Sequence, residues 1–317
     1  MTDVTADYLA LRRDVAAARV PRAVLRAFGA DSVEFLQGQL SQDVAGLVPG
    51  ESRWSLLLEP QGKVVAWLRL WGRHVDDEIL MDVEPAAAEV VLERLNRFRF
   101  RVNTEFELLD WQCVAVRGPA CPSPEEIDVR AELRGEAGWP GLRGVDLLGP
   151  QVALPDGMHV AGLDAYETVR VEAGWPANGS EFSWEPEPTV IPGEAGQWLI
   201  DRSVSFTKGC YTGQELVARV DSRGNRTPRQ LRGVVLGTNV VPPVGAEVVV
   251  VDADGGSQAR GVLTSVGESL DLRAPVALAW VHRSVEAPAP VELRWTGPSG
   301  EPAVASAEVR ELPLLSE

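Results

Sequence analysis

The residues best suited to chemistry lie in one octapeptide, Lys208-Gly209-Cys210-Tyr211-Thr212-Gly213-Gln214-Glu215. It holds one of the three cysteines and one of only two lysines, whereas arginine supplies the positive charge elsewhere in the chain. A lysine ammonium is a compact charge whose pKa shifts readily, and a cation two residues from a thiol favours the thiolate. These residue types predict a catalytic pair in which Lys208 activates Cys210.

The octapeptide also predicts how the thiol is positioned. Gly209 and Gly213 permit a tight turn, or the close approach of a ligand to the backbone. Gln214 and Glu215 open the apolar run Leu216-Val217-Ala218, so we expect a helix to begin here, and its dipole would favour the thiolate further. The alternative interpretation is a turn that carries a buried, inert cysteine.

Composition limits the classes of protein to consider. The chain has 317 residues, 45% of them apolar and 24% charged, which is typical of a globular protein with two or three domains. Its net charge of −16 makes it a poor general binder of nucleic acid or anionic membrane, so we expect neither as a direct partner. Three cysteines without a C-x-x-C pair, and residues 2–19 unlike a signal peptide, predict a cytoplasmic protein without a metal site.

The first two thirds of the chain mix helix and strand patterns. Residues 1–19 look like a variable leader or a short helix. Alternating apolar residues between turn residues predict strands at 22–28, 52–58, 64–71, 78–83, 105–111 and 113–117. Helices are expected after Asp31, at Pro85 and from Leu163 to Gly174, and the first and last have the acidic-x-x-Glu spacing of a capping box. The segment 119–148 is rich in Pro, Gly and charge and predicts little regular structure.

The pattern changes after Pro228. Six short runs rich in β-forming residues follow, separated by Gly, Pro and Asp, at 231–236, 246–251, 259–266, 276–281, 290–295 and 303–310. Evenly spaced short strands are typical of a small antiparallel barrel. The sequence therefore predicts an α+β body over residues 20–228 and a C-terminal β-barrel domain over 229–317.

Four segments resemble one protein family. The octapeptide matches the Lys-Gly-Cys-Tyr-x-Gly-Gln-Glu signature of the YgfZ-type folate-binding proteins, which are relatives of the glycine-cleavage T-protein. Phe35-Leu36-Gln37-Gly38-Gln39, the stretch 166–181 and Ile191-Pro192-Gly193-Glu194-Ala195 are similar to further segments of that superfamily. The resemblance covers roughly residues 20–285. It implies a T-protein-like folate-binding body, possibly of two interleaved subdomains, followed by an antiparallel β-barrel.

The resemblance also implies a function. It points to a folate-binding accessory protein in iron–sulfur cluster assembly or repair, with tetrahydrofolate or a related folate as cofactor and an indirect role in tRNA modification. The partners would be iron–sulfur enzymes or cluster-assembly proteins. The role of Cys210 stays open between a nucleophile, a transient cluster ligand and a packing residue.

The same resemblance implies which residues bind folate. Glu172 stands where the T-protein glutamate contacts the pterin ring, and a carboxylate can accept paired hydrogen bonds from the pterin amidine edge. The basic stretch 201–232 would hold the carboxylates of the folate tail. The expected cofactor-binding residues are Glu172, Arg170, Tyr211, Gln214, Glu215 and Arg219. Within the basic stretch, the basic residues are Arg202, Lys208, Arg219, Arg223, Arg226, Arg229 and Arg232.

The chain departs from the family pattern at one position that matters for catalysis. T-proteins follow their Gly-Gly turn with two aspartates, one of them catalytic, whereas this chain has Gln61-Gly62-Lys63-Val64-Val65-Ala66-Trp67. Aminomethyl transfer needs a group that handles a proton near the folate. The missing carboxylate argues against the alternative function, a tetrahydrofolate-dependent aminomethyltransferase or other one-carbon transferase. A binding module without redox chemistry is the third hypothesis.

Overall fold

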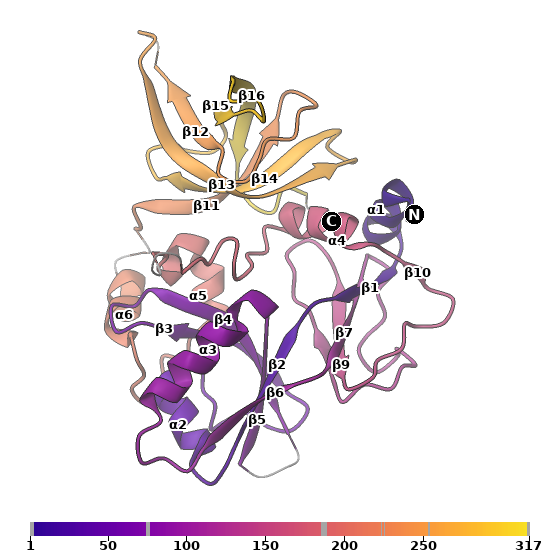
Figure 1. The fold of residues 1–317 in the computed structure, drawn as a ribbon, viewed down its shortest axis with the longest axis vertical. Coiled ribbons are helices and arrows are strands. Elements are labelled where there is room, and N and C mark those ends of the chain that lie inside the picture. Colours follow the sequence, from indigo (N-terminus) through magenta and orange to yellow (C-terminus); the bar gives the residue numbers. More distant parts are fainter. Residues whose placement is uncertain are drawn as a thin grey trace.

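The computed structural model describes residues 3–73, 77–184, 189–222, 224, 226–252 and 254–315. Within them, the chain forms two five-stranded sheets, a closed barrel of six strands and six α-helices (Figure 1). Arg223 of the basic stretch lies outside the described residues. In this part of the chain, no helix has both the length and the apolar character needed to cross a membrane.

The chain starts the first sheet, builds the second, and then returns to the first. The first sheet has the order β10-β1-β7-β9-β8 and the second β3-β4-β5-β2-β6. The strands of the first are β1 (Ala16–Val20), β7 (Gln112–Arg117), β8 (Leu133–Glu136), β9 (Gly144–Gly149) and β10 (His159–Val160). The strands of the second are β2 (Ala23–Phe28), β3 (Ser52–Leu58), β4 (Val64–Gly72), β5 (Glu78–Val83) and β6 (Glu105–Leu109). The six predicted strands of this region are present, and β8 and β9 lie in the segment for which little structure was expected.

The second sheet is covered on both faces, which explains why every residue of β4 and β5 is buried. Apolar residues of α2 (Ser32–Gln39) and α3 (Pro85–Phe98) pack on one face; Leu36 and Leu95 join Leu68 there in one core cluster. Trp67 and Trp71 point to the other face and join the larger core shared with the first sheet. This alternation follows from the two-residue period of a strand.

The helix boundaries were predicted well, but their caps were not. α4 (Leu163–Ala173) ends at Gly174 with φ 70°, the left-handed terminus that glycine favours. Neither expected capping box forms on α2 or α4. Asp31 instead accepts a hydrogen bond from the Asn103 backbone, and the Gly162 N–H that opens α4 donates to Asp7. Both carboxylates are therefore used by residues that are distant in sequence.

The expected leader is an ordered part of the fold. α1 (Val4–Arg13) is capped by Asp3, whose side chain accepts from the Thr5 and Ala6 N–H groups. Two residues of this helix, Tyr8 and Leu11, are fully buried. α1 lies beside α4, between the first sheet and the barrel (Figure 1).

The C-terminal strands close into an antiparallel barrel with the order β11-β14-β13-β12-β15-β16. Its strands are β11 (Arg229–Leu236), β12 (Glu247–Val251), β13 (Ser257–Ser269), β14 (Ala274–His282), β15 (Ala289–Thr296) and β16 (Pro302–Arg310). The barrel has its own apolar core, and β13 and β14 also pack on α4. The prediction of an α+β fold with a C-terminal antiparallel barrel is confirmed.

Candidate functional site

The octapeptide lies against two other segments that are distant in sequence. One is the end of α2, because the Thr212 N–H donates to the Gly38 carbonyl at 3.1 Å. The other is the turn at 59–63 between β3 and β4. Three of the sequence motifs, including the Phe-Leu-Gln-Gly-Gln segment and the Gln-Gly-Lys turn, are thereby brought together at one place.

Lys208 joins the octapeptide to α2. Its ammonium donates hydrogen bonds to the carbonyls of Gln37, Leu40 and Gln42, the last two at 2.6 and 3.0 Å. The Gln37 and Leu40 carbonyls belong to the C-terminal end of α2, where the helix dipole favours a cation, and Gln42 follows shortly after it. An ammonium has three N–H donors, so all of them are used. The Tyr211 ring lies 5.2 Å from the same nitrogen.

This geometry gives Lys208 a positioning role. Burial lowers the pKa of its amine to about 8, and the charge of Asp43 opposes the shift. The amine is therefore mostly protonated at neutral pH and holds the loop against α2. Its activation of Cys210 remains a prediction.

Packing requires glycine at two positions of the octapeptide junction, the place where the octapeptide meets α2 and the turn at 59–63. Gly213 has φ 83°, and a Cβ on it would lie 2.7 Å from the Glu59 carbonyl oxygen. Gly62 has φ 74°, and its Cβ would lie 2.7 Å from the Leu216 Cβ. Gly209 differs, because no atom lies within 4 Å of the position of its Cβ. Gly213 and Gly62 hold the turn and the octapeptide together, whereas Gly209 borders open space.

Cys210 is exposed, and the other two cysteines, Cys113 and Cys121, are buried; all three are free. Burial raises the pKa of the Cys113 and Cys121 thiols. Cys210 is thus the thiol that a solute can reach. The alternative of a buried cysteine at this position is wrong, and the reactivity of the exposed thiol remains a prediction.

The remaining predicted residues of the octapeptide serve local structure. Gln214 opens α6 (Gln214–Ser222), as expected, and its side chain accepts from the Tyr211 N–H at 3.1 Å. Glu215 and Arg219 form an ion pair of 2.6 Å on the exposed face of this helix. Burial raises the pKa of Tyr211 to about 12.

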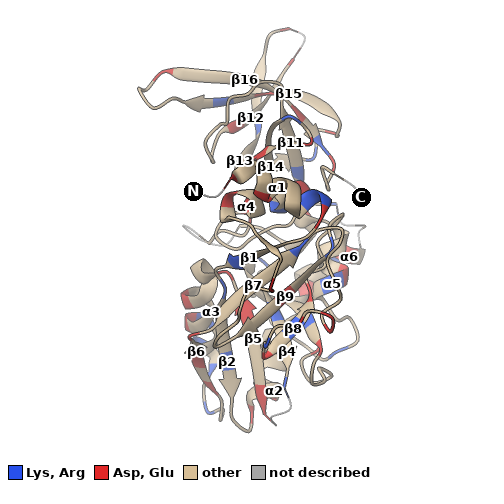
Figure 2. Cartoon of the chain, turned by 90° about the vertical axis from the view of Figure 1, so that its right-hand side faces the viewer, with Lys and Arg blue, Asp and Glu red and all other residues tan. Residues whose placement is uncertain are grey.

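Three of the basic residues in the stretch 201–232 pair with acidic side chains, Arg219 among them. Arg229 pairs with Glu194, and Arg232 pairs with Glu311. Figure 2 shows basic residues next to acidic ones around α5 (Gln197–Ser203) and α6. Arg202 instead stacks on aromatic rings, with its guanidinium 5.4 Å from Trp175. Arg226 is exposed. This stretch does not form the single open anion site that the sequence predicted.

Glu172 lies away from the octapeptide, between α1, α4 and β13. Its carboxylate accepts a hydrogen bond from the Tyr8 hydroxyl at 2.7 Å, lies 3.7 Å from the Arg12 guanidinium, and has no exposed side-chain surface. Burial raises its pKa, while hydrogen bonds from Ser269 and Tyr8 act in the opposite direction. Glu172 is fully buried and lines neither of the cavities described below, so its contact with a pterin ring, in a pocket shared with the basic stretch, remains a prediction.

Arg170 lies two residues earlier on α4 and does reach a pocket. Its guanidinium donates to the Trp175 carbonyl at 2.6 Å, to Glu181 at 3.1 Å and to Ser265 of the barrel at 2.7 Å. The side chain is only 6% exposed. Arg170 thus links the barrel to the wall of this pocket.

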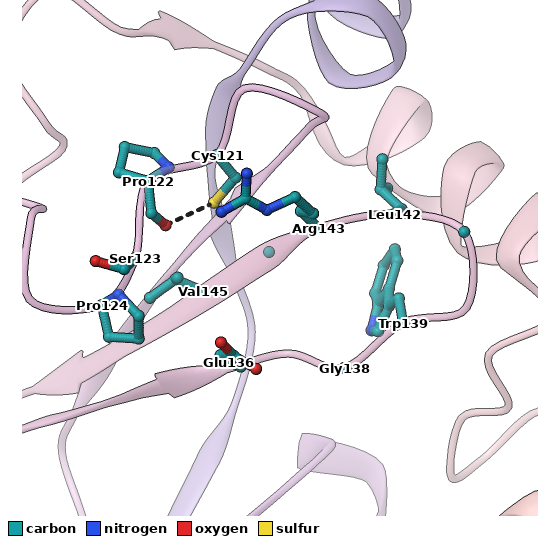
Figure 3. A pocket seen from close by; sticks show the side chains of 12 residues that line it. Cys121, Pro122, Ser123, Pro124, Glu136, Gly138, Trp139, Leu142, Arg143 and Val145 are labelled. Carbon is teal, nitrogen blue, oxygen red and sulfur yellow. Dashed lines mark hydrogen bonds between the residues drawn. The ribbon is translucent and has the colours of Figure 1, made fainter. Parts of the chain in front are cut away.

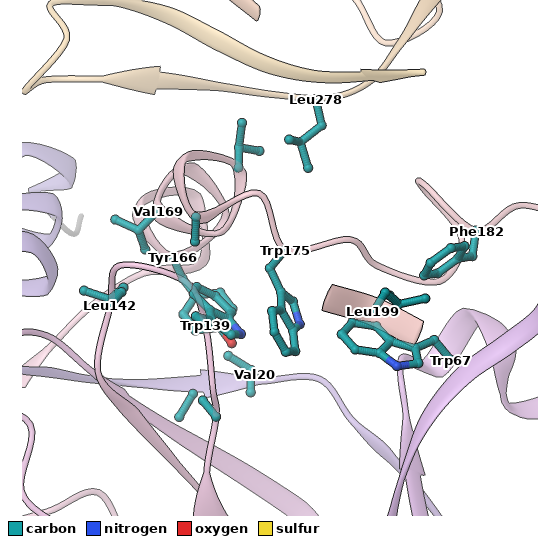
Figure 4. Close-up of a cluster of buried hydrophobic side chains, with 14 of the residues drawn as sticks. Val20, Trp67, Trp139, Leu142, Tyr166, Val169, Trp175, Phe182, Leu199 and Leu278 are labelled. Atoms are coloured by element: carbon teal, nitrogen blue, oxygen red, sulfur yellow. The ribbon is translucent and has the colours of Figure 1, made fainter. Parts of the chain in front are cut away.

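The pocket lies at the centre of the molecule, between the two sheets and α4, and has a volume of about 240 Å³. Ring faces form much of its wall: Trp54, Trp139, Tyr166 and Trp175. These rings belong to an aromatic cluster that also holds Trp67, Trp198 and Phe182. Figure 4 shows Trp175 between Trp139 and Trp67. A flat aromatic group is the ligand that such a wall suits.

The polar groups of this central pocket form ion pairs. Arg117 donates to Asp146 at 2.7 Å and to the Tyr166 hydroxyl at 3.1 Å. Arg22 pairs with Asp82 and Glu84. The Nε of Arg117 is buried and has no hydrogen-bond partner.

Trp67 occupies the strand position that follows the Gln-Gly-Lys turn. It is 1% exposed, its ring stacks on Trp54 at 4.3 Å, and its indole N–H donates to Ser203. The side chain of Asn178 hydrogen-bonds to both the N–H and the carbonyl of Trp67. Stacking and hydrogen bonds thus fix Trp67 beside the central pocket without making it part of the wall, whereas Asn178 and Glu84 do line the pocket.

A second hollow, of about 220 Å³, lies on the first sheet near β9 (Figure 3). Cys121 lines it, with its thiol 3.5 Å from the Pro122 carbonyl, beside Glu136 and Arg143. None of the predicted site residues lines this hollow. Among the described residues, no group of three or more His, Cys, Asp and Glu side chains is placed to hold a metal ion.

Sequence reasoning missed the wall of the central pocket. Tyr166 lay within the matched stretch, but Trp139 and Arg117 had no local pattern to mark them. Their signal was the unusual number of tryptophans, ten in the chain, which indicates aromatic core or pocket lining without saying where.

Comparison with known proteins agrees with this geometry, although no protein-family model matches the sequence. The chain is 28% identical over 315 residues to an aminomethyltransferase of Thermus thermophilus, covering 90% of this chain and 84% of that one. It is 30% identical over 205 residues to an uncharacterized protein of Haemophilus influenzae, covering 62% and 65%. It is 27% identical over 232 residues to the tRNA-modifying protein YgfZ of Sodalis glossinidius, covering 62% and 64%. The chain thus spans just under two thirds of the last two proteins.

The fold is shared with a solved structure, the glycine cleavage system aminomethyltransferase T of Bartonella henselae. The TM-score is 0.76 at 21% identity, and the match covers 98% of this chain and 89% of that one. The chain thus shares the fold of the T-protein and is similar in sequence to aminomethyltransferases and to a YgfZ protein, whose type its octapeptide resembles.

Proposed function

We propose that the protein binds tetrahydrofolate or a related folate in the central pocket and acts as an accessory protein in iron–sulfur cluster assembly or repair. The observation that supports folate binding is a cavity of about 240 Å³ lined by four aromatic residues, Trp54, Trp139, Tyr166 and Trp175, together with Arg117. Pockets for drug-sized ligands span roughly 300–1,000 Å³. The cavity therefore suits the pterin ring system, and the carboxylate tail would lie outside it.

The thiol of Cys210 would carry the chemistry. It is exposed on a loop that Lys208 and Gly213 fix to the rest of the fold. An accessible thiol on an ordered loop can attack an electrophile or bind a cluster iron during transfer. Cluster enzymes or cluster-assembly proteins would be the partners, and the effect on tRNA modification would follow from the enzymes that depend on such clusters.

The alternative is the aminomethyltransferase activity in the names of several relatives. In the described part of the central pocket, Glu84, Asp146 and Glu167 each pair with an arginine. The pocket supplies no unpaired carboxylate that could move a proton, which favours the accessory role over transfer.

Calorimetric titration with tetrahydrofolate tests the binding proposal. Trp139→Leu removes one ring face from the wall and should weaken binding about tenfold, the equivalent of roughly 1.4 kcal/mol. Glu172→Gln is the matched control, because its carboxylate is buried elsewhere and should leave affinity unchanged. Circular dichroism confirms that both variants are folded. Absence of binding by the wild type, or equal loss in both variants, would contradict the central-pocket assignment.

The cluster role needs a separate test. Cells lacking the protein are complemented with the wild type, Cys210→Ser or Cys121→Ser, and the activity of an iron–sulfur dehydratase is measured in extracts. We expect only Cys210→Ser to fail. Full activity with Cys210→Ser would exclude the thiol as the working group, whatever the folate result.

A further inference from the structure

A row of exposed arginines and phenylalanines follows the end of α3, on the outer side of the second sheet (Figure 1). Residues 96–101 are all exposed, and five of them read Arg97-Phe98-Arg99-Phe100-Arg101. Phe98 is 41% exposed and Phe100 is 75% exposed. With Arg94 one turn earlier, these residues form what we call the Arg/Phe surface. Large exposed aromatic rings are informative, because such side chains are usually buried in the core.

An arginine guanidinium lies over each phenylalanine ring of the Arg/Phe surface. The Arg94 guanidinium lies 4.4 Å from the centre of the Phe98 ring, and the Arg101 guanidinium lies 5.2 Å from that of Phe100. Cation–π contacts of this kind fix the orientation of an exposed ring. The exposure of Phe100 shows that most of its surface remains accessible to a partner.

The positive charge of the Arg/Phe surface is not neutralised within the described residues. No ion pair there involves Arg94, Arg97, Arg99 or Arg101; Arg94 and Arg99 donate only to backbone carbonyls. Burial lowers the pKa of Arg94, Glu59 opposes this, and the neighbouring Arg97 adds to it. Arg101 also holds a left-handed backbone, φ 56°, which favours glycine or asparagine over arginine. Four arginines without an ion pair among the described residues are thus kept together in a chain of net charge −16.

We propose that the Arg/Phe surface binds single-stranded nucleic acid. Phosphates would pair with the guanidinium groups, and unpaired bases would stack on the two rings, which is how proteins bind single strands without reading sequence. A segment of aspartate and glutamate residues would complement the charge but would offer no ring faces. An anionic membrane would also complement the charge, but its lipid headgroups would offer no ring faces to stack on the two phenylalanines. The net charge that argued against nucleic acid describes the whole molecule, and this surface lies outside the stretch 201–232.

The surface lies near the octapeptide junction. Arg94 donates to the carbonyl of Leu58 at 3.2 Å, and Leu58 adjoins the turn against which Gly213 packs. A strand bound on the Arg/Phe surface would therefore lie on the same part of the molecule as that junction. The proposal goes beyond folate binding and does not depend on it.

The test is fluorescence anisotropy of a fluorescein-labelled oligouridine of about twelve nucleotides at a series of salt concentrations. With up to four phosphates neutralised, log affinity should fall with log salt at a slope no steeper than about −2.8, and Arg97→Gln/Arg101→Gln should reduce the slope by about 1.4. Phe98→Leu/Phe100→Leu keeps apolar side chains but removes the rings and should weaken binding at least tenfold. Phe98→Tyr/Phe100→Tyr should bind like the wild type.

The control is Arg130→Gln/Arg283→Gln, which removes two exposed arginines from other surfaces and should leave binding unchanged. Polyglutamate and vesicles with one third phosphatidylserine are assayed in parallel. Three results would overturn the proposal: no binding of the oligonucleotide, equal loss in the control variant, or leucine variants that bind as tightly as the wild type. Binding of polyglutamate or vesicles alone would assign the surface to an acidic protein or a membrane instead.

Discussion

Replacing Gly213 by alanine should destabilise the octapeptide junction, whereas the same replacement at Gly209 should not. The two glycines flank the same cysteine, so the comparison holds the motif and the added methyl group constant. Gly213 has φ 83° and would place its Cβ 2.7 Å from the Glu59 carbonyl oxygen and 2.9 Å from the Leu58 Cβ. Gly209 is outside the left-handed region and has no neighbour within 4 Å of its Cβ position.

The magnitudes follow from these contacts. A left-handed conformation costs an alanine about 1–2 kcal/mol. The alanine Cβ would overlap the Glu59 backbone carbonyl, and rotating a side chain cannot relieve this overlap. Displacing the backbone adds a cost of about 1–3 kcal/mol. Gly213→Ala should therefore cost about 2–5 kcal/mol. Gly209→Ala should gain about 0.4–1 kcal/mol, because alanine has less conformational freedom in the unfolded chain.

Two measurements separate local from global effects. Urea unfolding followed by tryptophan fluorescence gives the overall loss, although a chain of several packed units need not unfold in two states. Hydrogen exchange of peptides spanning 205–220 reports the junction itself, including the Thr212 amide bonded to Gly38. Equal destabilisation by both alanines would refute the packing argument. Faster exchange in Gly209→Ala than in Gly213→Ala would also refute it.

Three further predictions concern charged groups and the exposed thiol. Lys208→Met should lower the free energy of unfolding by about 2–3 kcal/mol, because it leaves carbonyls of α2 without a donor. Folding lowers the pKa of the Lys208 amine from 10.5 to about 8. Wild-type stability should therefore rise relative to this variant between pH 8 and 10.5, as measured by urea unfolding. Folding raises the pKa of Glu172, so wild-type stability should rise relative to Glu172→Gln as pH falls through the raised pKa towards 4.5, and a flat difference would disprove this. Cys210→Ser should change stability by less than about 0.5 kcal/mol and abolish the fast alkylation by iodoacetamide, followed by mass spectrometry with Cys121→Ser as control.

Local sequence patterns predicted the parts of the fold that local physics determines. The alternation of apolar residues located β3, β5 and the barrel strands, and Pro85 and Gly174 marked helix ends through their own backbone preferences. The same reasoning placed the start of α6 at Gln214. These features depend on neighbours a few residues apart, which a single sequence displays directly.

The surroundings of the candidate site depend on residues far apart in the chain. The partner of Glu172 is Tyr8, 164 residues away on a helix that looked like a variable leader. Lys208 binds carbonyls about 170 residues upstream, and a backbone carbonyl has no sequence signature. The exposure of Cys210 and the central pocket also depend on tertiary packing. The motif therefore showed which residues matter, while their partners required the structure.

The aromatic cluster has an optical consequence. Five of the ten tryptophans lie in it, at positions 54, 67, 139, 175 and 198, with ring centres 4.3–6.2 Å apart in successive contacts. Indoles this close exchange excitation energy much faster than they emit. A single quencher bound in the central pocket would therefore quench the fluorescence of all five indoles. A local loss of packing in the cluster would shift the emission maximum of all five. Intrinsic tryptophan fluorescence should therefore report occupancy of the central pocket without an added label.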